Sequence, residues 1–208
     1  MKVIRYLLIT VCMLQTGFVT LAQTCPPADT TQVVPVQDNW EFPPQNSWNG
    51  LEIMTWNVKS FPLSGYTTNN ISETVSDMLP DVICFQEIAD LYEFETLADG
   101  LPAYEFITTD YEADGGFPGY DLGIAVKSDC LQVLDTETLF PFDDWEFAYR
   151  NPLKAELAWS CGDAAMEFVM INVHLKCCND GFDRRLAASQ ILVDYIHSQI
   201  NSGNETNI

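Results

Sequence analysis

The stretch DVICFQE, residues 81–87, carries the clearest fold signal in the sequence. A short apolar run that follows Pro80 and ends in polar residues is typical of a strand buried on both faces. By period-two alternation, we expect Ile83, Phe85 and Glu87 to lie on one face of this strand. A carboxylate that continues an apolar face is costly to bury unless it is solvated, paired or bound to a metal. Glu87 is therefore the first candidate functional residue.

The segments on both sides of this strand predict a layered α/β protein. Residues 51–58 predict a strand, and residues 71–78 predict a helix that Pro80 ends. Further helices are expected at residues 89–98 and 182–200, and further strands at residues 104–108, 122–127, 154–159 and 167–175. In the last helix, Leu186, Val193, Ile196 and Ile200 share one face. This order favours helices outside buried sheets.

The N-terminal segment has the features of an export signal. Lys2 and Arg5 precede an apolar stretch, and small residues follow it near position 22. The stretch is short and interrupted for a membrane span. Residues 1–22 are therefore predicted to be a signal peptide, residues 23–48 a polar, Pro-rich lead-in, and residues 49–208 the folded domain. The expected location is secreted or periplasmic.

The charge balance is strongly acidic. The 208 residues include 9 Lys and Arg against 30 Asp and Glu, for a net charge of -21, while 47% of the residues are hydrophobic. This composition argues against a protein that grips nucleic acid by charge alone, because phosphate contacts usually come from Lys and Arg. An anionic substrate would need a bound cation or a local Arg to offset the field.

The cysteines fit an oxidising compartment. Of the seven, Cys12 lies in the predicted leader, and an even number remains, which suggests disulfides. Cys84 lies in the apolar run and is expected to be a buried thiol. The adjacent Cys177 and Cys178, near Cys161 and Cys130, could staple neighbouring strand ends, and Cys25 is the sixth of the set; the sequence leaves the pairing open. A zinc site is disfavoured because no CxxC pair has matching His spacing.

Further residues could act with Glu87. Asn57 ends the first predicted strand, and Asn172 and His174 share one face of a later strand. Arg150 precedes Pro152, and its planar guanidinium suits bidentate phosphate binding. Each residue also has an ordinary structural reading: a solvated strand end, a satisfied strand histidine, or a surface ion pair. Together, a carboxylate, an amide, an imidazole and a guanidinium suit metal-assisted attack on a phosphate ester.

Three segments carry a family resemblance. MTWNV (residues 54–58), DVICFQEI (residues 81–88) and INVHL (residues 171–175) resemble, in order and spacing, the signatures of the endonuclease/exonuclease/phosphatase superfamily. That superfamily includes deoxyribonuclease I, sphingomyelinases and inositol phosphatases. The resemblance covers about residues 50 to 208. The segment from Arg150 to Pro152 is also similar to the phosphate-binding Arg-x-Pro of deoxyribonuclease I.

The resemblance implies a fold, a reaction and a set of roles. The fold would be a four-layer α/β/β/α sandwich, with the site at one edge of two packed sheets. Glu87 and Asn57 would hold Mg²⁺, or another divalent cation such as Mn²⁺ or Ca²⁺. His174 and Arg150 would bind the phosphate and stabilise its developing charge, with Asn172 as a partner behind them. The implied reaction is metal-dependent hydrolysis of a phosphodiester or phosphomonoester.

The sequence departs from the family pattern after the last helix. The family continues there into a strand ending in a Gly-Asp-x-Asn motif and, later, an Asp-His pair, and neither occurs in these 208 residues. We therefore expect a C-terminally incomplete member of a secreted bacterial type, with the second half of the fold truncated, little hydrolysis by itself and exposed apolar surface.

Two other interpretations stay open at this point. The chain could be a secreted, disulfide-stapled binding module of the same fold without catalysis. As an enzyme, it could act on nucleic acid, a phospholipid head group or a small phosphoester. No stable protein partner is predicted.

Overall fold

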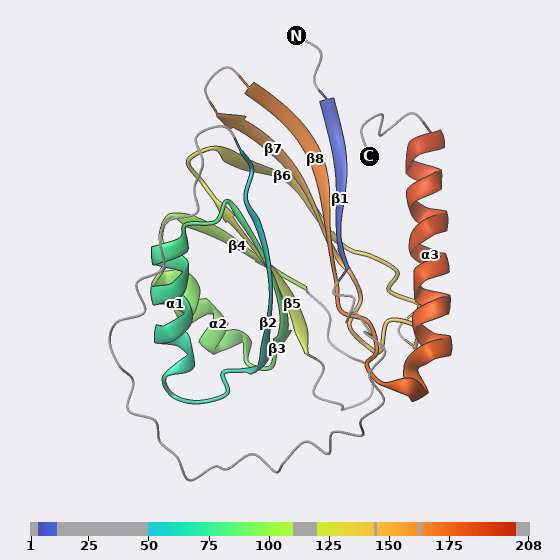
Figure 1. Cartoon of the computed structure of the whole chain (residues 1–208), viewed down its shortest axis with the longest axis horizontal. Coiled ribbons are helices and arrows are strands. Elements are labelled where there is room, and N and C mark those ends of the chain that lie inside the picture. The colour runs from blue at the N-terminus through green and yellow to red at the C-terminus, as the bar shows by residue number, and fades with distance from the viewer. Residues whose placement is uncertain (1–3, 12–49, 110–119, 144, 162–163, 203–208) are drawn as a thin grey trace, which may run out of the picture.

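The computed structural model describes residues 4–11, 50–109, 120–143, 145–161 and 164–202 (Figure 1). Its first sheet has the strand order β2-β3-β5-β4 and its second sheet the order β1-β8-β7-β6. The strands are Ile4–Val11 (β1), Ile53–Phe61 (β2), Val82–Ile88 (β3), Tyr104–Thr108 (β4), Asp121–Lys127 (β5), Leu131–Thr138 (β6), Leu153–Cys161 (β7) and Ala164–Val173 (β8). The helices are Thr67–Met78 (α1), Leu91–Asp99 (α2), the short 3₁₀ turn Asn179–Gly181 (η1) and Phe182–Asn201 (α3).

The elements form four layers. Helices α1 and α2 cover the outer face of the first sheet, and α3 covers the outer face of the second (Figure 1). Three buried clusters fill the interfaces: one between α1, α2 and the first sheet, one between the sheets, and one between the second sheet and α3. The predicted α/β/β/α sandwich is confirmed.

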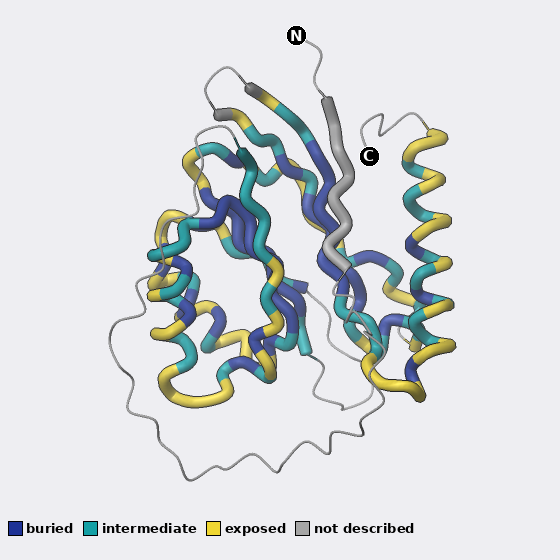
Figure 2. The backbone as a smooth tube through the Cα atoms, viewed as in Figure 1, coloured by how far each residue is buried: buried dark blue, intermediate teal, exposed yellow. Residues whose placement is uncertain are grey.

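Strand β3 is buried on both faces, as its apolar run predicts. Ile83 and Phe85 pack toward α1 and α2, whereas Val82 and Cys84 pack between the sheets. The Cys84 side chain is completely buried, in agreement with the sequence. Buried residues, in dark blue, gather in the region where Figure 1 labels β3 and β5 (Figure 2).

Two strands were not predicted from the sequence. Strand β6 (Leu131–Thr138) has exposed side chains at most positions, so its residues lack the apolar pattern that marks a buried strand. Strand β1 (Ile4–Val11) lies inside the predicted signal peptide and pairs in parallel with β8. Signal-peptide cleavage stays a prediction; it would remove β1 and leave β8 at the edge of the second sheet.

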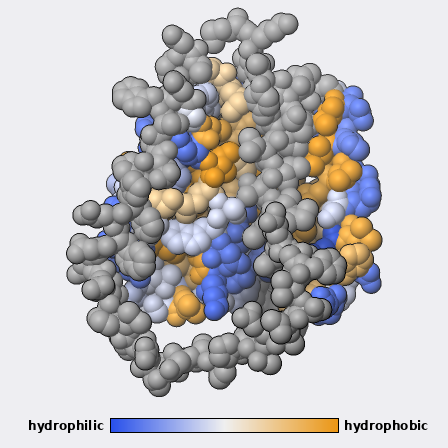
Figure 3. Space-filling model, in the orientation of Figure 1, coloured by the Kyte–Doolittle hydropathy of each residue, from blue (hydrophilic) through white to orange (hydrophobic). Residues whose placement is uncertain are grey.

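Helix α3 packs through a different face from the one that its apolar residues suggested. Ala188 and Leu192 are buried against the second sheet. Leu186, Val193 and Ile200 are instead 61%, 42% and 44% exposed. Hydrophobic surface along α3 is visible at the right of Figure 3.

Other differences are at element ends. Helix α1 begins at Thr67, four positions before the predicted start, and ends at Met78 before Pro80. The predicted lead-in (residues 23–48) and Cys25 lie outside the described residues. Within the described part of the chain, no helix is long and apolar enough to span a membrane.

Candidate functional site

Two backbone bulges build the site in the first sheet. Glu87 has a φ of 66°, and the β3–β5 register shifts between Gln86 and Ile88. Ile88 therefore packs in the same cluster as Phe85, although the two residues would lie on opposite faces of a regular strand. The expectation that Glu87 continues the Ile83 and Phe85 face is wrong, because the left-handed residue changes the alternation and re-aims the carboxylate.

Strand β2 has a matching irregularity. Lys59 and Ser60 have φ values of 46° and 53°, and the β2–β3 register shifts between Asn57 and Phe61. Trp56 and Val58 pack on the helix side of the sheet, so Asn57 points to the opposite side. Non-glycine residues with positive φ are uncommon and are often found at functional sites.

The Glu87 carboxylate is held by β2. The Asn57 Nδ2 atom donates to Glu87 Oε1 at 2.9 Å, and the Ser60 backbone N–H donates to Oε2 at 3.2 Å. The Asn57 Oδ1 atom accepts from the Lys59 backbone N–H at 2.8 Å. The amide nitrogen of Asn57 thus faces the carboxylate, and both residues are fixed in orientation.

The second sheet supplies the groups that face Glu87. Nε2 of His174, which follows β8, lies 3.7 Å from Glu87 Oε1. The Arg150 Nη1 atom lies 2.9 Å from His174 Nδ1, and its Nη2 atom donates to the Leu175 carbonyl at 3.5 Å. The Arg150 Nε atom is buried and has no hydrogen-bond partner within the described structure. A buried, unpaired guanidinium donor is costly and fits an anionic ligand.

Burial and neighbouring charges control the protonation of these groups. Burial, and next the Arg150 charge, lower the pKa of His174 to about 4, against an opposing effect of Glu87. Burial lowers the pKa of Arg150 as well, while the Glu87 charge raises it. At neutral pH the imidazole is therefore neutral. Since Arg150 can only donate, Nδ1 accepts, and the ring proton is assigned to Nε2, facing Glu87.

A buried amide pair joins the two sheets directly behind the site. The Asn172 Nδ2 atom donates to the Phe85 carbonyl at 2.8 Å and to the Gly123 carbonyl at 2.9 Å. Its Oδ1 atom accepts from Gln86 Nε2 at 2.9 Å. Gln86 also contacts the Thr55 hydroxyl at 3.1 Å. The Asn172 side chain is completely buried and fully paired, so it holds β8 against β3 and β5.

The structure brings most of the predicted site residues together. Glu87, Asn57, His174 and Arg150 form one contact group. Asn172 lies behind this group, as a positioning residue rather than one that reaches the site. The other histidine, His197, is exposed on α3.

Sequence reasoning missed the contributions of Ser60 and Gln86. Ser60 acts through its backbone N–H and a left-handed conformation, which the residue type does not reveal. Its hydroxyl lies 2.7 Å from the Tyr120 hydroxyl, which connects the site to β5. Gln86 did leave a signal, since it is an amide on the inward-facing side of an apolar strand.

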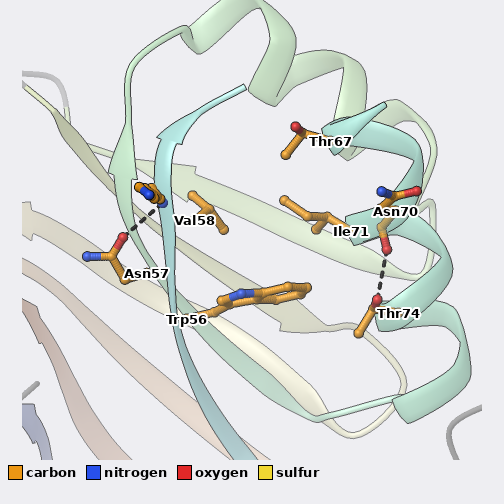
Figure 4. A pocket seen from close by; sticks show the side chains of 8 residues that line it. Trp56, Asn57, Val58, Thr67, Asn70, Ile71 and Thr74 are labelled. Carbon is orange, nitrogen blue, oxygen red and sulfur yellow. Dashed lines mark hydrogen bonds between the residues drawn. The ribbon is translucent and has the colours of Figure 1, made fainter. Parts of the chain in front are cut away.

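A cavity of about 230 Å³ lies on the other side of β2 (Figure 4). Trp56, Val58 and Ile71 give it apolar walls, and Asn70 and Thr74 contribute polar groups from α1. In Figure 4 the Asn57 side chain points away from α1 and accepts the Lys59 N–H. Asn57 also lines the cavity, whereas Glu87, His174 and Arg150 do not, so Asn57 is the member of the contact group that the cavity reaches.

The donors present fit a hard divalent cation only partly. Glu87 offers a carboxylate that keeps lone pairs available beyond its bonds to Asn57 and Ser60. Mg²⁺ can be held by one or two carboxylates, with waters and substrate phosphate completing the octahedron. The Asn57 oxygen is bonded to Lys59, so Asn57 orients Glu87 in this conformation. No cluster of three or more His, Cys, Asp or Glu side chains suited to a metal occurs among the described residues.

Comparisons with known proteins give the fold. No protein-family model matches the sequence, and no curated protein is significantly similar to it. D. rerio TDP2 complexed with a single-strand DNA product is 20% identical, with a TM-score of 0.54 over 71% of this chain and 54% of that chain. C. elegans TDP2 is 18% identical, with a TM-score of 0.52 over 73% of this chain and 44% of that chain.

The human Nocturnin catalytic domain with a bound sulfate anion is 16% identical, with a TM-score of 0.52 over 74% of this chain and 61% of that chain. The chain spans roughly half the length of the TDP2 structures that it matches. At these identities the similarity concerns the fold. The chain therefore has the deoxyribonuclease I-like fold, the α/β/β/α sandwich of the endonuclease/exonuclease/phosphatase superfamily.

Proposed function

We propose that this protein is a divalent-metal-dependent phosphoesterase, and that the contact group of Glu87, Asn57, His174 and Arg150 is the phosphate-binding part of its active site. One observation carries the proposal. The Glu87 carboxylate from one sheet lies 3.7 Å from His174 Nε2, and His174 Nδ1 in turn lies 2.9 Å from Arg150 Nη1 of the other sheet. A carboxylate facing a buried cation and an imidazole can bind a phosphate together with its counter-cation.

Each residue has a role that follows from its contacts. Arg150 binds a phosphate oxygen through its guanidinium, whose Nε–H has no protein partner among the described residues. His174, which is neutral at pH 7, directs its Nε2 proton toward the same oxygen and stabilises charge that develops there. Asn57 and the Ser60 N–H hold the Glu87 carboxylate in place. A divalent cation bound at Glu87 would supply Lewis-acid stabilisation of the phosphate.

The acidic surface bears on the substrate and on the cation. With a net charge of -21, the protein repels polyanions unless a cation and Arg150 compensate locally. Nucleic acid, a phospholipid head group and a small phosphoester all present the required phosphate. Export through the N-terminal segment, and a bacterial secreted origin, are part of the same proposal.

The test separates binding from catalysis. Inorganic phosphate and Mn²⁺ binding would be measured by calorimetry, and hydrolysis of bis-p-nitrophenyl phosphate would be followed with Mg²⁺, with Mn²⁺ and with chelator. Glu87→Gln should abolish cation binding, and Glu95→Gln, on the exposed surface of α2, should not. Arg150→Gln should weaken phosphate binding by about ten- to a hundredfold, the size of a charge-assisted contact.

The outcomes are distinct. We expect little hydrolysis from these 208 residues by themselves and chelator-sensitive hydrolysis from the longest reading frame that contains them. Phosphate binding without hydrolysis in either form would favour a non-catalytic binding module. Absence of both phosphate and cation binding would refute the proposal.

A further inference from the structure

Two adjacent thiols lie beside the contact group but take no part in it. Cys177 and Cys178 follow β8 and are both exposed. The Cys178 thiol lies 3.0 Å from the Cys177 sulfur and donates to it. The sulfur atoms are therefore already in contact.

The sheet register separates this pair from the other described cysteines. The Cys130 carbonyl accepts from the Ser160 N–H at 2.8 Å, at the C-terminal end of β7. Asn172, five residues before Cys177, pairs instead with Leu153 at the start of β7. The strand between these ends spans roughly 25 Å at about 3.3 Å per residue. The expectation that Cys177 and Cys178 staple strand ends near Cys130 and Cys161 is therefore wrong.

The pair also has the electrostatics of a reactive thiol. The hydrogen bond from Cys178 lowers the pKa of Cys177, and the Lys176 and Arg150 charges act in the same direction. The Lys176 Nζ atom lies 3.8 Å from the Cys177 sulfur. The same thiol contact raises the pKa of Cys178. Cys177 therefore loses its proton first and is the nucleophile of the pair.

The backbone on either side of the pair is anchored. The Arg185 Nη1 atom donates to the Lys176 carbonyl at 2.7 Å and to the Cys178 carbonyl at 2.8 Å. Cys178 has a φ of 68°, a left-handed conformation that is uncommon outside glycine. Adjacent Cα atoms lie about 3.8 Å apart, closer than in most disulfides. A bridge between them would be strained and easily reduced.

We propose that Cys177 and Cys178 are a vicinal redox pair that closes to an intramolecular disulfide. A small-molecule disulfide, such as oxidised glutathione, is the oxidant. The Cys177 thiolate attacks one sulfur of this disulfide and releases one thiolate. Cys178, after losing its proton, attacks the Cys177 sulfur and releases the second. The pair loses two electrons and two protons, and the small disulfide becomes two thiols.

Peptide mapping tests closure without reference to activity. The protein would be treated with oxidised glutathione, its remaining thiols alkylated, and the product digested with trypsin, which cleaves after Lys176 and Arg184. The proposal expects one unlinked peptide, residues 177–184, lighter by two hydrogen atoms and restored by reductant. Stable glutathione adducts on both cysteines, or linkage of this peptide to another, would overturn it.

Variants separate the steps. Cys178→Ser should trap glutathione on Cys177, and Cys177→Ser should react more slowly than wild type, whereas Cys130→Ser should still close the bridge. Two alkylated thiols in wild-type protein after treatment with oxidised glutathione would also overturn the proposal.

Discussion

The Nη1 atom of Arg150 lies 2.9 Å from Nδ1 of His174, so that a permanent cation contacts a titratable ring. Arg150 precedes β7 and His174 follows β8, and the antiparallel pairing of those strands brings the two residues together. The contact disfavours imidazolium and orients the neutral ring toward Glu87. Its first consequence concerns pH.

We predict that His174 makes the folded state sensitive to acid. Its folded pKa of about 4 lies below the ordinary 6.5, so its contribution is complete above pH 6.5 and is lost as the pH falls through about 4. Relative to His174→Gln, the wild-type unfolding free energy should fall over this window by up to about 3 kcal/mol. Urea denaturation across this pH range measures it. The exposed His197→Gln should follow wild type. Burial raises the pKa of Asp81 to about 6, so Asp81 also titrates in this window. The comparison with His174→Gln cancels its contribution, because both proteins contain Asp81.

Removal of the Arg150 charge should raise the pKa of His174. Arg150 is the second cause of the lowered pKa, after burial. In Arg150→Met, burial persists but the cation is gone, so the ring should titrate at a higher pH than in wild type. Because the chain has two histidines, NMR titration of the ring resonances resolves both. An unchanged His174 titration would show that the Arg150–His174 contact does not form in solution.

The buried amide pair should behave as one unit. Asn172→Leu leaves the Phe85 and Gly123 carbonyls and the Gln86 amide without their partner. We expect a loss of about 2 to 4 kcal/mol in the unfolding free energy. In a double-mutant cycle with Gln86→Leu, the two losses should be non-additive by about 1 kcal/mol or more. Additive losses would mean that the Gln86–Asn172 bond contributes nothing.

Gly123 should not tolerate a side chain. A Cβ atom there would lie 2.8 Å from the Phe94 ring and 2.9 Å from Ile88 Cδ1, both in the core. Gly123→Ala should therefore lower the unfolding free energy by about 1 to 3 kcal/mol. Gly65→Ala is the matched control, because nothing lies within 4 Å of its added Cβ. Equal thermal stability of the two variants would contradict the prediction.

Local patterns in the sequence were sufficient for the layers. The apolar run before Glu87, the alternation of Ile171 and Val173 with Asn172, and the stop at Pro80 depend on residues next to one another in the chain. The apolar pattern that predicts a buried face also lies within one short segment of the chain. Most of the strand and helix order could therefore be predicted, whereas a common site for Glu87, Asn57, His174 and Arg150 came from the family resemblance.

The alternation rule failed where the backbone leaves the regular strand. At Glu87 and at Ser60 the φ angle is positive, and neither residue type announces this conformation. The conformation is stabilised by the contacts of Glu87 with Asn57 and Ser60, which come from another strand. The packed face of helix α3 was also mispredicted, since Ala188 and Leu192 contact the second sheet, a partner distant in the sequence.

By itself, the sequence determined a layered α/β class, the buried strand β3 and the residue types of the candidate site, because each follows from short-range periodicity and side-chain chemistry; the α/β/β/α arrangement came from the family resemblance. Only the tertiary structure decided that Glu87 faces His174, that Asn172 bonds to the Phe85 and Gly123 carbonyls, and that Cys177 and Cys178 are remote from Cys130. Those facts depend on strand register and on two bulged residues. Both are set by hydrogen bonds between strands that are distant in the sequence, and the residue pattern of one strand carries no record of its partner.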